Sequence, residues 1–116
     1  MPVISELAVD ADARSLSCLL LVPRDLPVFR GHFPGVPIVP GVMQVGWAVE
    51  LARGNGLAQG PLVGIGIAKF RRILRPGMRL DARVGQGAVP GQLHFSYAIE
   101  GTVVSSGRLQ FGVGHD

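Results

Sequence analysis

Residues 41–53, GVMQVGWAVELAR, decide the fold, because they are the one stretch of this chain that is typical of a helix. Pro40 stands at its start and two glycines follow its end, as is common at helix boundaries. At 3.6 residues per turn it is apolar almost all round, with Gln44 and Glu50 as its polar residues before the last turn. We therefore expect a helix buried on all sides, in which a carboxylate is costly unless it is paired or used.

The rest of the chain is typical of strands separated by turns. Apolar and polar residues alternate along most of these segments. The expected strands are residues 3–9, 15–22, 62–70, 79–84, 92–100 and 102–111. One helix without β-α-β units excludes a doubly wound fold. We predict a single α+β domain over residues 1–116, with an antiparallel six-stranded sheet wrapped around one central hydrophobic helix.

Composition narrows the class of protein. The 116 residues include 17 Gly and 9 Pro, but 47% are hydrophobic and only 16% are charged, which excludes a charge-rich disordered chain. We see neither an apolar run of about 18 residues nor a signal peptide, so we expect a cytoplasmic protein with no membrane contact. Cys18 is the only cysteine, so no internal disulfide and no cysteine-based metal site is expected.

Basic residues gather in the second half of the chain, in a protein of net charge +3. They are Lys69, Arg71, Arg72, Arg75, Arg79 and Arg83. Asp81 is the only acidic residue between positions 69 and 83. The sequence has no helix-turn-helix pattern, no zinc spacing and few aromatic residues, so we expect no nucleic-acid partner. The cluster is otherwise typical of a solvated strand face.

The segment before the helix, residues 23–40, holds five of the nine prolines and cannot be helical. Its second half and the helix start, GHFPGVPIVPGV at 31–42, resemble the GHFPGxPxxPGV signature of 3-hydroxyacyl-acyl-carrier-protein dehydratases. KFRRILRPG at 69–77 resembles that family's KFRRxxxPG segment. The resemblance covers nearly the whole chain. It implies the hotdog fold, active sites at a dimer interface, and removal of water from 3-hydroxyacyl thioesters to give trans-2-enoyl thioesters without a cofactor.

The resemblance also implies roles for particular residues. His32 matches the family's general base, and imidazole can take a proton near neutral pH. The backbone N–H groups of Gly41 and Val42 match the donors to the thioester oxygen, since a helix N-terminus offers unpaired N–H groups and a positive dipole end. Phe33 and Val42 are expected to contact the substrate.

One position departs from the family pattern. The family carries Glu or Asp six residues after the last proline of the motif, where this chain has Gly46. Glu50 lies one turn further, about 6 Å along the axis, and is our candidate for the catalytic acid, directly or through a water. Alternatively, Glu50 pairs with an arginine and does no chemistry. Gln44 is a third candidate and is expected to contact the substrate, but its amide can supply only a hydrogen bond to the leaving hydroxyl, not a proton.

The run Q-x-x-W-A after PGV resembles the aryl-polyene (ApeI-like) branch of these FabZ-like dehydratases. On this basis Trp47 is a candidate for lining the acyl tunnel, although a Trp at helical spacing is more often core, which we favour. Arg71, Arg72 and Arg75 are candidates for contacting an acidic acyl carrier protein or its phosphate.

Partners and alternative functions follow from the same resemblance. A coenzyme A thioester is the alternative carrier, and we expect a homodimer or a higher even oligomer. Two other functions stay open: a hotdog acyl thioesterase in which Glu50 activates water, and a non-catalytic hotdog subunit that binds acyl carriers.

Overall fold

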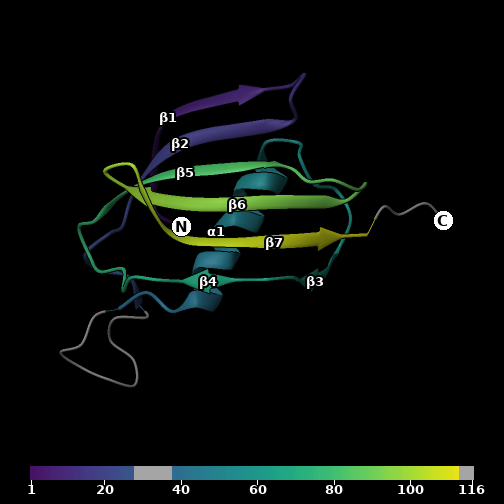
Figure 1. Ribbon diagram of the computed structural model, residues 1–116. Coiled ribbons are helices and arrows are strands. Elements are labelled where there is room, and N and C mark those ends of the chain that lie inside the picture. The colour runs from purple at the N-terminus through teal and green to yellow at the C-terminus, as the bar shows by residue number, and fades with distance from the viewer. Residues whose placement is uncertain (28–37, 113–116) are drawn as a thin grey trace.

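The protein is described by a computed structural model over residues 1–27 and 38–112, and these residues form one helix and seven strands (Figure 1). The helix is α1 (Gly41–Gly54), and the strands are β1 (Val3–Asp10), β2 (Ser15–Leu21), β3 (Leu62–Ile65), β4 (Lys69–Phe70), β5 (Arg79–Gln86), β6 (Gln92–Ile99) and β7 (Thr102–Phe111). The strands form one antiparallel sheet in the order β1-β2-β5-β6-β7-β3, and β4 also pairs with β7. The predicted α+β arrangement of one helix against an antiparallel sheet is confirmed.

The sheet has seven strands because the segment expected as one strand, 62–70, is divided in two. Gly66 donates its N–H to Arg108 O at 2.8 Å, whereas Lys69 lies opposite Ser106. The chain therefore advances by three residues from Gly66 to Lys69 while β7 advances by only two, from Arg108 to Ser106. The extra residue forms a bulge that interrupts the ladder. β3 and β4 run in line along the same side of β7 (Figure 1). The expectation of one continuous strand was wrong in this detail.

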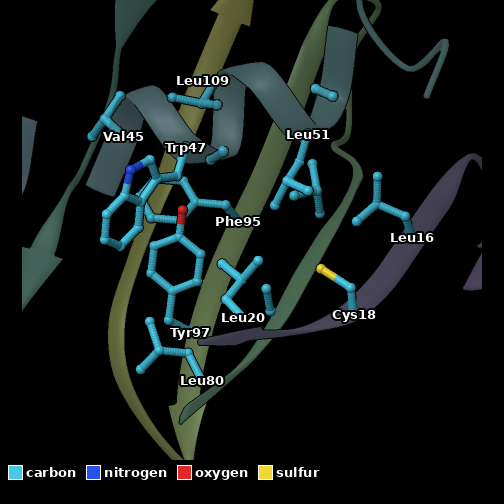
Figure 2. Packing of buried hydrophobic residues seen from close by; sticks show 14 of the residues in the cluster. Leu16, Cys18, Leu20, Val45, Trp47, Leu51, Leu80, Phe95, Tyr97 and Leu109 are labelled. Carbon is cyan, nitrogen blue, oxygen red and sulfur yellow. The ribbon is translucent and has the colours of Figure 1, made fainter. Parts of the chain in front are cut away.

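The core lies between α1 and the inner face of the sheet. Alternate residues of the strands point toward the helix, as their pattern of burial shows. The main contributors are Leu16, Cys18, Leu20, Leu80, Ala82, Val84, Leu93, Phe95, Tyr97, Leu109 and Phe111 from the sheet, and Val45, Trp47, Ala48, Leu51 and Ala52 from the helix. Figure 2 labels ten of these side chains and shows them meeting between α1 and the sheet. The packing fixes the helix across the sheet, and its first turn therefore lies beside β4.

The helix is not buried on all sides, which corrects the sequence-based expectation. Val42 is 80% exposed, and Gly46 and Glu50 are exposed as well. These residues are spaced by four and lie on one stripe of α1 that the sheet does not cover. In the single chain, the carboxylate of Glu50 therefore avoids the desolvation that a fully buried helix would impose.

Candidate active site

A small pocket opens at the start of α1, where the helix meets the end of β4. Its volume is about 200 Å³. The lining residues are Ile38, Val39, Gly41, Gln44, Phe70, Arg71, Arg72 and Ile73. The pocket thus combines a helix N-terminus, an aromatic ring and two guanidinium groups, which together suit a polar or anionic group attached to an apolar chain.

The first two amides of α1 have no partner among the residues that the structure describes. Pro40 is the N-cap and provides no side-chain hydrogen bond. Met43 and Gln44 donate their N–H groups to Pro40 O, at 3.1 and 3.2 Å. Among the described residues, the N–H groups of Gly41 and Val42 have no hydrogen-bond acceptor. They can therefore donate to an oxygen placed at the helix N-terminus.

The ring of Phe70 lies so close to the backbone of Gly41 that a side chain at position 41 would displace it. A Cβ atom on Gly41 would lie 2.8 Å from Cε2 of Phe70, closer than real Cβ atoms approach other atoms. The ring of Phe70 therefore packs directly on the backbone of the helix start. Phe70 is also 43% exposed, so the ring forms a wall of the pocket that a ligand can reach.

We expect Gly41→Ala to lower kcat/KM about tenfold, because the new methyl group displaces the Phe70 ring or shifts the first amides. Steady-state kinetics would measure this loss. Gly46→Ala in the same helix is the control. Within residues 1–27 and 38–112 nothing lies within 4 Å of a Cβ there, and the substitution should stabilise the helix by about 0.5–1 kcal/mol. Equal activity of the two variants would show that the tight contact at Gly41 is irrelevant to turnover.

Gln44 lies inside the core rather than on the exposed stripe, and it is only 2% exposed. Its amide Nε2 donates to Val39 O at 3.3 Å, and its Oε1 accepts from Ser105 Oγ at 2.6 Å. Its backbone oxygen accepts from the Tyr97 hydroxyl at 2.6 Å. The side chain borders the pocket, but its amide is engaged on both sides by the protein itself.

Burial raises the pKa of Tyr97, and the nearby Cys18 thiol adds to the effect, so the hydroxyl stays protonated and able to donate. Burial also raises the pKa of Cys18. Both groups hold their protons in the folded protein at a pH where the unfolded chain loses them. Their contribution to stability is complete below the unfolded pKa values and is lost as pH rises toward the folded ones.

The free energy of unfolding should therefore fall as pH rises above about 8.5 and more steeply above about 10, the ordinary pKa values of Cys and Tyr. Urea denaturation across this pH range would measure the decline. Tyr97 is the only tyrosine, so Tyr97→Phe should flatten the upper part of the curve. A curve of the same slope in this variant would contradict the assignment.

The other candidate residues are distributed as follows. Trp47 lies in the core, 4% exposed, with its ring edge-on to Tyr97 at 6.5 Å between centroids. Arg71 and Arg72 line the pocket, whereas Arg75 is exposed on the loop before β5 and is not among the lining residues. Glu50 lies about 12 Å from Val42 along the helix axis. His32 and Phe33 lie outside the described residues.

Sequence reasoning missed three residues of this region. Phe70 was quoted only as part of a motif, and Tyr97 and Ser105 were assigned to strands without a role. A signal for Tyr97 exists, because its hydroxyl interrupts the apolar row that it forms with Leu93 and Phe95. Nothing in the sequence distinguishes Ser105 from its neighbour Ser106.

No group of three or more His, Cys, Asp or Glu side chains within residues 1–27 and 38–112 is placed to hold a metal ion. Over the same ranges, α1 is too short to reach across a bilayer.

The fold and the site define a class of protein, a hotdog domain with an open helix start at its pocket. A solved structure titled as the dehydratase heterocomplex ApeI:P from Xenorhabdus doucetiae has the same fold, with a TM-score of 0.84 and 26% identity over 95% of this chain and 96% of that chain. The hotdog fold implied by the sequence motifs is thereby confirmed.

Sequence comparison narrows the class to a family. The family model described as ApeI dehydratase matches residues 8–108. The 3-hydroxyacyl-[acyl-carrier-protein] dehydratase FabZ of Chlamydia trachomatis is 33% identical over 90% of this chain and 76% of its own length, and that of Chlamydia pneumoniae is 37% identical over 92% and 78%. The chain belongs to the ApeI-like dehydratases.

Proposed function

We propose that this dehydratase removes water from 3-hydroxyacyl chains carried on an acyl carrier protein, in fatty-acid or polyene-type biosynthesis. The observation that carries the proposal is the start of α1, where the N–H groups of Gly41 and Val42 have no acceptor among the described residues and Gly41 lines a pocket of about 200 Å³. Loss of the C2 proton places negative charge on the thioester oxygen. Two backbone donors stabilise that charge most when it is fully developed, as catalysis requires.

His32 is our proposed base. It stands nine residues before Gly41 in the motif that leads into the helix, and imidazole can accept the C2 proton near neutral pH. Phe33 and Val42 are proposed to contact the acyl chain. The reaction balances with no added reagent: the C2–H and C3–O bonds break, a C2=C3 double bond forms, and water leaves.

The acid that assists the departing hydroxyl is proposed to be Glu50. Gly46 occupies the position where the family pattern places its carboxylate, and no atom of the described residues lies within 4 Å of a Cβ there. The exposed stripe therefore leaves an open path along the helix from Glu50 toward the pocket. Because Glu50 lies about 12 Å from Val42 along the axis, we propose that a water carries the proton between the carboxylate and the hydroxyl.

The carrier is proposed to approach over Arg71 and Arg72, which line the pocket, with Arg75 on the adjoining loop. Arginine binds phosphate through two parallel hydrogen bonds, so these residues suit the phosphopantetheine phosphate. Coenzyme A carries the same phosphopantetheine arm and is the alternative carrier. We also propose that the enzyme needs no cofactor and works in the cytoplasm.

Assembly is proposed to be a homodimer formed along β3. This strand pairs only with β7 among the described strands, and Val63 and Ile65 beside its open edge are 62% and 51% exposed. Ile67, which follows β3, is 65% exposed. Exposed apolar side chains along an unpaired sheet edge are of the kind that marks an interface.

We expect the wild-type chain to sediment as a dimer and Ile65→Asp to sediment as a monomer with reduced activity, because the new carboxylate would be desolvated in the interface. Val3→Asp, on the opposite edge of the sheet, is the matched control and should remain dimeric. A dimer in Ile65→Asp, or a monomer in the wild type, would contradict the proposed interface. The Xenorhabdus relative is titled a heterocomplex, so a wild-type monomer would direct the search to a different partner chain.

The function is tested by supplying purified protein with a 3-hydroxyacyl chain on acyl carrier protein or on coenzyme A. We expect the absorbance of a conjugated enoyl thioester to appear without release of free thiol. Thiol release without enoyl formation would instead indicate a thioesterase. Binding without either product would indicate a non-catalytic subunit.

A further inference from the structure

Two buried polar residues, Gln44 and Ser105, interrupt the apolar interior of the described chain, at 2% and 1% exposure. Burying polar groups destabilises a protein by about 1–3 kcal/mol when they lack partners, and apolar residues would fill the same space without that cost. Here every buried side-chain polar atom of the described residues has a hydrogen-bond partner. A fully satisfied network of this kind holds its members in one geometry.

The network ties the start of α1 to one row of the sheet. Tyr97 on β6, Ser105 on β7 and Phe70 on β4 are direct neighbours across three strands. Tyr97 donates to the backbone oxygen of Gln44, and Ser105 donates to its side chain. Figure 2 shows the Tyr97 hydroxyl directed at α1. Gln44 is therefore hydrogen-bonded to two adjacent strands, to β6 through Tyr97 and to β7 through Ser105.

The peptide that enters the helix is fixed from both sides. Val39 accepts a hydrogen bond from Gln44 Nε2 and donates its own N–H to Leu74 O at 2.9 Å. Pro40 and Gly41 follow directly. The direction of the free amides of the first turn thus depends on the position of the Gln44 side chain.

Ser105 connects the two walls of the pocket. Its hydroxyl holds Gln44 on the helix side, while its backbone lies opposite Phe70 in the β4–β7 ladder. The next wall residue, Arg71, donates its N–H to Val104 O at 2.7 Å. The separation between the helix amides and the Phe70–Arg71 wall is therefore set through residues 104–105.

We infer that Ser105, acting through Gln44 and supported by Tyr97, is a positioning residue that aims the Gly41 and Val42 amides at the thioester oxygen. Gln44 on this account is not a substrate contact. The inference rests on the proposed function for its kinetic consequence, but the geometry that it describes belongs to the protein alone. A misplacement of about 1 Å in such donors can cost about 100-fold in rate.

The first test is the kinetics of Ser105→Ala. We expect kcat to fall about 10- to 100-fold while KM changes less than about threefold, because the lost interaction acts on the transition state. Leu16→Val is the matched control, since it removes buried volume on β2, away from Tyr97 and the pocket (Figure 2). An equal fall of kcat in both variants, or a rise in KM alone, would overturn the inference.

The second test needs no turnover. Backbone amide NMR signals of Gly41 and Val42 should move in Ser105→Ala, whereas the signal of Gly54 at the other end of α1 should not. Unmoved signals at the helix start would overturn the inference. A wild-type protein without dehydratase activity would refute the proposed function, and the amide signals would still decide the positioning role.

Discussion

Replacing His32 by Ala should lower the turnover of 3-hydroxyacyl thioesters by about 10²- to 10⁴-fold, the range that general acid–base groups contribute. The loss should appear in kcat, because the base acts on the C2 proton rather than on substrate binding. Initial rates of enoyl formation at saturating substrate would measure it. This is the largest single effect that we expect from any substitution in the chain.

A matched control is available for this substitution. His94 is exposed on β6, and its position opposite Arg108 places it on the side of the sheet away from α1. His94→Ala should therefore retain wild-type turnover. If His32→Ala were as active as His94→Ala, the proposed base would be wrong, whatever the activity of the wild type.

Glu50→Gln should lower kcat by about 100-fold, because an amide can hold a water but cannot give it a proton. Steady-state rates of enoyl formation at saturating substrate would measure the loss. An unchanged kcat would remove Glu50 from the mechanism and leave it as a surface charge.

Gly46→Glu supplies the complementary test. The site has room for a side chain, since none of the residues that the structure describes comes within 4 Å of a Cβ there. Replacing the glycine should also favour the helix. A carboxylate at this position should restore at least part of the activity lost in Glu50→Gln. Gly46→Gln in the same background is the control for size. Equal rates for the Glu and Gln substitutions would argue against any acid on this stripe.

Much of the fold could be predicted because local signals and tertiary packing agree. The expected helix 41–53 and the observed Gly41–Gly54 differ by one residue, since Pro40 and the glycines mark both ends. The strand expected at 62–70 is interrupted at residues 66–68 because a bulge at a sheet edge has no alternation signature. Pairing with β7 determines it, and pairing is not visible in one segment alone.

The site was harder to predict because α1 is apolar almost all round. Such a helix carries no periodic signal for which face meets the sheet, so Gln44 and Glu50 could not be assigned to the inside or the outside. The structure places Gln44 toward β6 and β7 and leaves Glu50 on the open stripe. Gly41 could be placed from its motif, whereas its contact with Phe70 depends on strands that meet only in the folded sheet.

The most direct test of the account is the mass of the acyl chain on its carrier, followed over time with the wild-type protein and with His32→Ala. We expect the acyl chain to become lighter by the mass of one water with the wild-type protein, while it stays attached to its carrier. With His32→Ala the mass of the acyl chain should not change over the same period. Release of the whole acyl chain by the wild type, or no change at all, would contradict the account.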